Sequence, residues 1–176
     1  RFLPLFVTQF LGAMNDNLFK QALVVLVTFR LAQALDINGQ IFVTVAAGVF
    51  ILPFFLFSAT AGQLADKYEK SRSIRIIKAF EIAIMSLAVM GYYTEAPYFL
   101  MAVLFLMGTQ SAFFGPLKYS ILPDHLRDDE LIGGNALIEG ATFLAILIGT
   151  IAGGLIILTE RGTEITSIAV VAFAVL

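Results

Sequence analysis

The sequence predicts an all-α polytopic membrane protein. Hydrophobic residues make up 59% of its 176 residues, charged residues 14%, and the mean hydropathy is +0.91. These values lie outside the range of ordinary soluble domains. The apolar residues gather in windows long enough to cross the bilayer core, which takes about 20 residues of helix. Helices are the required structure because lipid-facing backbone groups must be satisfied within their own segment, and the sequence lacks a porin-like alternation of apolar and polar residues.

Five windows are long enough to span a membrane, and a sixth begins near Thr166. The chain starts at Arg1 and stops at Leu176 inside an apolar run, so we expect residues 1–176 to be one incomplete domain of a longer polypeptide. The five complete windows are Phe2–Leu31, Ile41–Leu64, Ile74–Tyr93, Pro97–Leu122 and Leu137–Leu158.

The connections between the windows differ in their basic residues. The connection after the second window, DKYEKSRSIR, contains Lys67, Lys70, Arg72 and Arg75, and the connection after the fourth contains Arg127. Those after the first and third windows contain no Lys or Arg. By the positive-inside rule we expect the ends of the even-numbered windows, and therefore the N-terminus, to face the cytoplasm.

Composition also narrows the classes of function. The chain has 11 basic and 13 acidic residues, which gives no electrostatic case for binding nucleic acid. It has no Cys, so this segment contains no disulfide, Cys-ligated zinc or reactive thiol. A single His, with no Gly-rich phosphate loop and no metal-ligand cluster, argues against an enzyme. We therefore expect no cofactor and no metal.

The first window contains the polar stretch FLGAMNDNLFK. Gln9, Asp16 and Lys20 are separated by 7 and 4 positions, so they share one face of a helix. An ionised Asp16 facing lipid would cost about 2.5 to 3.5 kcal/mol, so this face should point into the protein. Asp16 and Lys20 could neutralise each other as an ion pair. Alternatively, the face lines a water-filled cavity in which Asp16 binds a cation, oriented by Asn15 and Asn17.

The fourth and fifth windows supply further charged candidates. Gly115 and Pro116 should bend the fourth helix, and Lys118 follows the bend. Lys118 could reach the headgroups of the cytoplasmic leaflet, or its ammonium could face the cavity as the partner of a phosphate. Glu139 shares a helix face with Thr142 and is a second carboxylate candidate, either functional or structural.

Two other patterns predict contacts that hold helices together and not a binding site. Lys78 and Glu81 in the third window are three residues apart, a spacing that favours a local salt pair. Gly149, Gly153 and Gly154 in the fifth window form a small-residue surface, which lets another helix approach closely.

The stretch GQLADKYEKSR, between the second and third windows, resembles the cytoplasmic loop signature of the major facilitator superfamily. Gly62 would permit a close helix end, and Asp66 would cap the following helical segment or a facing helix terminus. Lys70 and Arg72 would fix the loop at the membrane surface. The resemblance implies that these four residues lock the two halves of a transporter together. Glu69 departs from the signature, which usually has Gly at that position.

Within this superfamily the chain looks most like bacterial lysophospholipid transporters, including those fused to acyltransferase and acyl carrier protein ligase domains. The matching stretches are QFLGAMNDN, FFGPLKYSIL and GNALIEGATFLAILIGTIAGG. The resemblance implies the N-terminal half of the transporter fold, with five helices and a truncated sixth. It also implies functional roles for Asp16 and Lys118 in headgroup recognition or ion coupling, and Glu139 matches the pattern of the fifth helix.

The implied function is movement of a lysophospholipid, such as lysophosphatidylethanolamine, across the bacterial inner membrane by alternating access. The implied partners are membrane lipid, a C-terminal half of six helices, and a fused or associated acyltransferase. Two alternatives stay open. The first is a proton-coupled exporter of drugs or small metabolites on the same fold, although IGTIAGG lacks the Pro usual in such exporters. The second is a membrane platform for an attached enzyme, without transport of its own.

Overall fold

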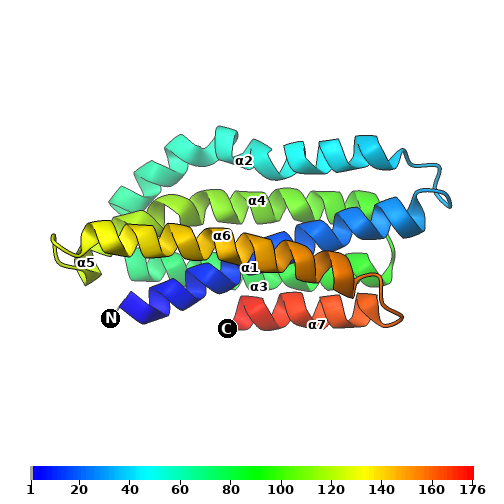
Figure 1. Cartoon of the computed structure of the whole chain (residues 1–176). Coiled ribbons are helices and arrows are strands. Elements are labelled where there is room, and N and C mark those ends of the chain that lie inside the picture. Colours follow the sequence, from blue (N-terminus) through cyan, green and yellow to red (C-terminus); the bar gives the residue numbers. More distant parts are fainter. Residues whose placement is uncertain (1) are drawn as a thin grey trace.

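The computed structural model describes residues 2–176, and these residues form a bundle of helices without any β-strand (Figure 1). Arg1 lies outside the described residues. In chain order the elements are α1 (Phe2–Leu26), a π-helical turn η1 (Val27–Leu31), α2 (Gly39–Lys67), α3 (Lys70–Tyr93), α4 (Pro97–Ser120), the short α5 (Leu122–His125), α6 (Leu131–Ile156) and α7 (Gly162–Val175).

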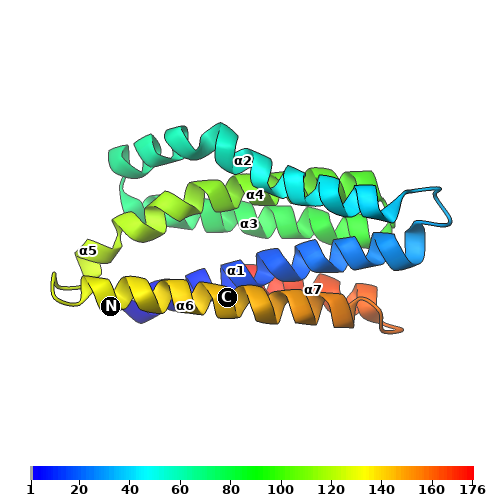
Figure 2. The same ribbon diagram turned by 45° about the horizontal axis from the view of Figure 1, so that its top comes forward.

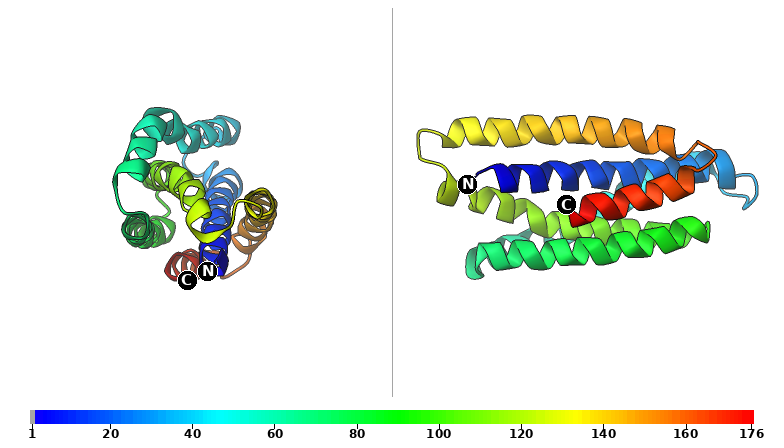
Figure 3. Two further views of the ribbon diagram at one scale, coloured as in Figure 1. Left: turned by 90° about the vertical axis from the view of Figure 1, so that its left-hand side faces the viewer. Right: turned by 90° about the horizontal axis from the view of Figure 1, so that it is seen from below.

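Helix α1 lies at the centre of the bundle (Figure 3). It packs along α6 on one side and contacts α4 and α7 on the others. Helix α2 packs on α4, and α3 packs on α4 and α7. Helix α2 bends in its middle part, as the turned view in Figure 2 shows. Pro53 lies inside this helix and removes one backbone hydrogen-bond donor. Because α6 lies on one side of α1 and α4 and α7 lie on the others, α1 presents side chains to all three of these helices.

The six predicted windows correspond to the six long helices in order. By length and composition α2, α4 and α6 are each apolar enough to cross a membrane, and α7 is a shorter apolar helix. Helices α1 and α3 have 25 and 24 residues, which is long enough to span, and they bury polar groups inside the bundle: Gln9, Asn15, Asp16 and Asn17 on α1 and Glu81 on α3. The predicted all-α membrane fold is confirmed.

Some boundaries differ from the prediction because a helix does not end where its apolar residues end. Helix α6 begins at Leu131 and not at Leu137, since the polar and glycine-containing segment before the apolar window is also helical. Helix α5, which the sequence did not predict, follows α4 almost directly, with Pro123 in its first turn. These additions extend the bundle at the end that holds the α2–α3 connection.

The connection between α2 and α3 is much shorter than the loop predicted from sequence. It consists of Tyr68 and Glu69, and the Glu69 carboxylate accepts hydrogen bonds from the backbone nitrogens of Ser71, at 3.0 Å, and Arg72, at 2.7 Å. Glu69 is therefore the N-cap of α3, and the prediction that Asp66 caps the following helix is wrong. The Arg72 amide lowers the pKa of the Glu69 carboxyl, so the cap is lost as the pH falls through that lowered pKa.

Lys70 and Gly62 of the motif differ in their contacts within residues 2–176. The ammonium of Lys70 donates to the carbonyl oxygen of Ser120 and to Asp124 Oδ2, both at 2.7 Å, which ties the start of α3 to the end of α4 and to α5. A Cβ added at Gly62 would meet nothing within 4 Å among the described residues, so the close helix contact predicted there is absent from this part of the chain.

Close packing of α6 against α1 depends on two glycines. A Cβ at Gly149 would overlap the carbonyl oxygen of Met14, and a Cβ at Gly153 would overlap that of Leu18. Both obstacles are backbone atoms, which cannot move aside as a side chain can. The small-residue surface predicted from sequence is thus confirmed at these two positions. At Gly154 a Cβ would make ordinary contact, 3.5 Å from Gln21 Cγ.

Replacing either glycine should loosen this interface. We expect Gly149→Ala and Gly153→Ala each to destabilise the full-length protein by about 1–3 kcal/mol, because the added methyl group displaces the backbone of α1. Thermal unfolding in detergent would measure the change. Gly140→Ala is the matched control on the same helix, since its Cβ would meet nothing within 4 Å. Equal unfolding midpoints for all three variants would contradict this account of the interface.

Candidate functional site

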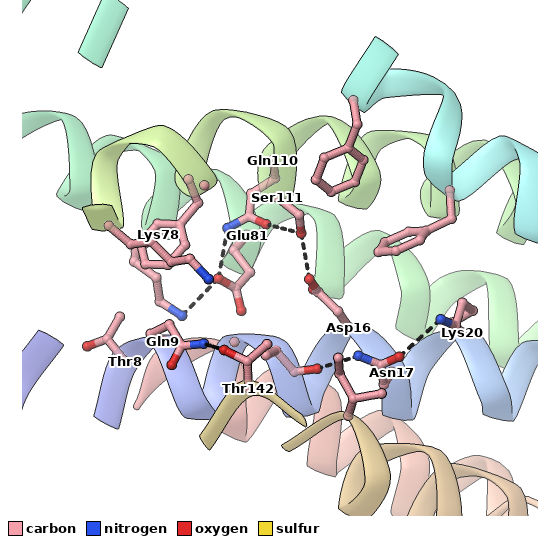
Figure 4. Close-up of a pocket in the computed structure, with 18 residues that line it drawn as sticks. Thr8, Gln9, Asp16, Asn17, Lys20, Lys78, Glu81, Gln110, Ser111 and Thr142 are labelled. Carbon is pink, nitrogen blue, oxygen red and sulfur yellow. Dashed lines mark hydrogen bonds and ion pairs between the residues drawn. The ribbon is translucent and has the colours of Figure 1, made fainter. Parts of the chain in front are cut away.

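A cavity of about 370 Å³ lies against α1, between α2, α4 and α6, and reaches side chains of α3 (Figure 4). Its lining combines lysines, carboxyl groups, amides and aromatic rings. The lining residues are Thr8, Gln9, Gly12, Ala13, Asp16, Asn17, Lys20, Phe50, Phe54, Lys78, Glu81, Gln110, Ser111, Phe114, Gly115, Lys118, Thr142 and Ile146.

Helix α1 forms one wall of this cavity. The face predicted from the sequence, Gln9, Asp16 and Lys20, lines it together with Asn17. Asp16 is 9% exposed, and its Oδ2 lies 2.5 Å from the Ser111 hydroxyl, which donates to it. Its second oxygen, Oδ1, is buried and has no hydrogen-bond partner among the described residues. An unsatisfied carboxylate oxygen beside a cavity has the capacity to accept a donor or to bind a cation.

The side chains next to Asp16 are held by other groups. The Lys20 ammonium donates to Asn17 Oδ1 at 3.0 Å and lies 4.9 Å from the centre of the Phe50 ring. Asn17 in turn donates to the carbonyl oxygen of Ala13 at 2.8 Å. Within residues 2–176 no salt bridge joins Asp16 to Lys20. The neutralising pair considered from the sequence is therefore not formed.

Glu81 of α3 is the centre of a buried polar network. It is 1% exposed and accepts from Lys78 Nζ at 2.8 Å, from Gln110 Nε2 at 3.1 Å and from Asn15 Nδ2 at 3.5 Å. The predicted local pair of Lys78 and Glu81 is confirmed. Sequence reasoning missed the wider role of Glu81, because its partners on α1 and α4 are distant along the chain. The polar run Thr109, Gln110 and Ser111 inside the otherwise apolar α4 could have indicated a polar contact at this point of the helix.

The network also reaches Asp16. The Ser111 hydroxyl lies 3.2 Å from Gln110 Oε1 as well as 2.5 Å from Asp16 Oδ2, and its single proton can serve one acceptor at a time. Figure 4 shows this sequence of contacts running across the cavity from Lys78 to Asp16. The two carboxyl groups of the lining are thus connected through one amide and one hydroxyl.

Lys118 and Glu139 lie at the α5 end of the cavity. Lys118 lines the cavity, with its ammonium 3.8 Å from Glu139 Oε1 and 4.7 Å from the centre of the Tyr119 ring. Glu139 accepts a hydrogen bond from the Tyr119 hydroxyl, and its side chain is 46% exposed. It does not line the cavity. The hypothesis that Glu139 is a buried carboxylate is therefore wrong. Glu139 lies about 60° around α6 from Thr142, which bonds Gln9 and lines the cavity, and this offset leaves Glu139 half-exposed.

The predicted residues thus fall into two places. Five of the six binding candidates line one cavity, namely Gln9, Asp16, Asn17, Lys20 and Lys118. The four candidates for the conformational lock, Gly62, Asp66, Lys70 and Arg72, lie near the α2–α3 connection and do not line that cavity.

The chemistry of the lining favours binding over covalent catalysis. Three ammonium groups, from Lys20, Lys78 and Lys118, share the described cavity with the carboxyl groups of Asp16 and Glu81. From Thr8 to Lys20 the α1 wall rises about 18 Å, at 1.5 Å per residue. Residues 2–176 contain no group of His, Cys, Asp and Glu that could hold a metal ion. Such a cavity suits a ligand that carries both charges and an apolar part.

Comparisons with known proteins place this geometry in a family. The profile of the Major Facilitator Superfamily matches residues 5–176. The chain is 31% identical over 154 residues to the lysophospholipid transporters LplT of Salmonella schwarzengrund (strain CVM19633), Salmonella newport (strain SL254) and Salmonella agona (strain SL483). These matches cover 88% of this chain and 36% of each relative, so the chain spans little more than a third of their length.

No solved structure matches the chain significantly. The superfamily profile nevertheless covers nearly the whole sequence, and the LplT relatives agree with the resemblance carried by the polar stretches of α1, α4 and α6. The chain therefore belongs to the major facilitator superfamily, and within it the chain is similar to lysophospholipid transporters.

Proposed function

We propose that the full-length protein moves a lysophospholipid across the bacterial inner membrane, and that the described cavity binds its headgroup. The observation that carries this proposal is the pairing, in one apolar-walled cavity, of a weakly engaged ammonium at Lys118 with an unsatisfied carboxylate oxygen at Asp16. A lysophosphatidylethanolamine headgroup has the complementary pair, a phosphate and an ammonium. The names of the LplT relatives agree with a substrate of this class.

Lys118 is the best phosphate partner among the three lining lysines. Lys78 is paired with Glu81 at 2.8 Å, and Lys20 is bonded to Asn17 at 3.0 Å. Within the described residues the nearest carboxylate to the Lys118 ammonium is 3.8 Å away, on a half-exposed side chain. A phosphate that entered the cavity could replace that contact at little cost, because Glu139 keeps its bond to Tyr119 and its access to water.

Asp16 is placed to take the ammonium of the same headgroup. Ser111 bonds Asp16 and precedes Lys118 by seven residues on α4, which is about 10 Å along the helix axis. An ethanolamine phosphate with one ion-pair contact at each end spans a comparable length. The acyl chain would leave the headgroup along the aromatic side of the cavity, next to Phe50 and Phe54 of α2 and Phe114 of α4.

Transport also needs parts that the chain does not contain. Because the chain spans 36% of each LplT relative, we propose that a second half of six helices completes the cavity and that the two halves rock around it. We further propose a cytoplasmic N-terminus, which follows from the basic residues near the α2–α3 connection, and a fused or associated acyltransferase as a partner.

Removing the Lys118 ammonium should weaken substrate binding. We expect Lys118→Gln to raise the apparent KM for lysophosphatidylethanolamine uptake into vesicles roughly thirtyfold, the equivalent of about 2 kcal/mol for one hydrogen bond to a charged group. Arg127→Gln is the control, since it removes a positive charge from an exposed position outside both the cavity lining and the loop signature. Unchanged uptake kinetics in Lys118→Gln would overturn the phosphate assignment.

Asp16→Asn separates the two roles considered for this carboxylate. If Asp16 holds the lipid ammonium, the isosteric amide should lower uptake of lysophosphatidylethanolamine at least tenfold and spare lysophosphatidylglycerol, which has no ammonium. If Asp16 instead holds a coupling ion, uptake of both lipids should lose its dependence on a sodium or proton gradient.

Vesicle uptake with and without each gradient makes both measurements in one assay. Full activity of Asp16→Asn with both lipids, and with an unchanged gradient dependence, would show that Asp16 serves neither purpose. Efflux of amphiphilic cations with no lysolipid uptake by the unmodified protein would instead support the drug-exporter alternative.

A further inference from the structure

A second hollowed surface lies between α3 and α4, and at one end α2 also lines it with Ala61, Leu64 and Ala65. Two hollows there, of about 450 and 470 Å³, share Ile76, Ile77 and Phe113 in their linings. Because they share these three lining residues, we treat them as one surface, which we call the α3–α4 groove. Its other lining residues are Ala61, Leu64, Ala65, Tyr68, Glu69, Arg72, Ser73, Ala79, Phe80, Ala83, Thr109, Gln110 and Leu117.

The groove is separate from the transport cavity. Helix α4 lies between α3 and α1 (Figure 3). Thr109, Phe113 and Leu117 of α4 line the groove. Ser111, Phe114 and Lys118, on the other side of the same helix, line the cavity. Gln110 lines both, and its amide nitrogen is held by Glu81 at 3.1 Å. A molecule in the groove would therefore contact the outer side of the buried network without entering the cavity.

The groove changes character along its length. One end lies at the α2–α3 connection, where Tyr68, Arg72 and Ser73 line it. From Arg72 to Ala83 the α3 wall rises about 16 Å, at 1.5 Å per residue, and the lining beyond Ser73 is mostly apolar. A polar mouth at the end of a membrane-spanning helix, with an apolar channel leading into the hydrocarbon region, matches the shape of a phospholipid with one acyl chain in the channel.

The charge of the mouth selects the headgroup. Arg72 is exposed, and its guanidinium has no hydrogen bond or ion pair with any described residue. The acidic residue of the lining is Glu69, and both of its carboxylate oxygens accept backbone amide hydrogens at the start of α3. Glu69 keeps its negative charge, but backbone amides occupy both of its oxygens, so Arg72 is the charged group of the lining that is available to a ligand.

We propose that the α3–α4 groove binds an anionic phospholipid of the leaflet at the α2–α3 end of the bundle. Arg72 binds the phosphate, Tyr68 lies at the level of the headgroups, and one acyl chain lies along Ile76, Ile77 and Phe113. This lipid is a resident ligand and not the transported substrate. The proposal does not depend on the proposed function, because the groove lies outside the transport cavity.

The test is photolabelling of the full-length protein in nanodiscs of phosphatidylethanolamine. The probe is phosphatidylglycerol, added as a minor component, with a photoreactive diazirine on one acyl chain. Labelled peptides should contain Ile77 or Phe113. Labelling should fall about fivefold in Arg72→Gln, the effect of one basic residue at an anionic membrane surface. Arg127→Gln is the matched control, since it removes an exposed arginine from the α5–α6 connection, away from the groove lining.

A second pair of variants tests the channel itself. Ile77→Trp should fill the groove and lower labelling several-fold, whereas Leu87→Trp, at an exposed apolar position on α3 outside the lining, should leave it unchanged. Equal labelling by the same probe with a phosphatidylcholine headgroup would overturn the proposal. Equal labelling of Arg72→Gln and the unmodified protein would also overturn it. Neither outcome would bear on lysophospholipid uptake, which is measured separately.

Discussion

The arrangement of these helices depends on the hydrogen bonds made by the buried carboxylate of Glu81. A charged group inside the bilayer is tolerated when other polar groups surround it, and Glu81 receives hydrogen bonds from Lys78, Gln110 and Asn15. Asn15 also donates to the carbonyl oxygen of Val170 at 3.0 Å. One carboxylate thereby connects α1, α3, α4 and α7. Replacing its partners with apolar groups one at a time would leave a charge without compensation in a region that excludes water.

The same network explains why a cavity can exist beside α1. Ser111 and Gln110 of α4 are held by Asp16 and Glu81, so their polar atoms stay at the cavity wall and do not turn outward to lipid. On the opposite side, Gly149 and Gly153 bring α6 into backbone contact with α1. Helix α1 is thus held by α4 and by α6, while its face with Gln9, Asp16 and Lys20 lines the cavity. A rigid wall with exposed polar groups is what a binding site for a charged headgroup requires.

Much of this architecture could be predicted from the sequence, because it depends on local patterns. Hydropathy located the six long helices, the spacing of Gln9, Asp16 and Lys20 placed them on one face, and glycine spacing identified the α6 interface. The environment of Glu81 could not be predicted, since Asn15 and Gln110 are 66 and 29 residues away along the chain. Nor could the exposure of Glu139, because residues assigned to one face of a helix still differ by about 60°, and periodicity does not show where the edge of the cavity falls between them.

The central claim is that the polar face of α1 lines a cavity that binds lysophospholipid headgroups. Gly12 lies on this face, a Cβ there would meet nothing within 4 Å, and the segment has no cysteine. The most direct measurement is therefore the reaction of Gly12→Cys, in an otherwise cysteine-free full-length protein, with a water-soluble maleimide. We expect the thiol to react, and lysophosphatidylethanolamine to slow the reaction strongly while diacyl phosphatidylethanolamine does not. An unreactive thiol, or equal rates with both lipids, would contradict the claim.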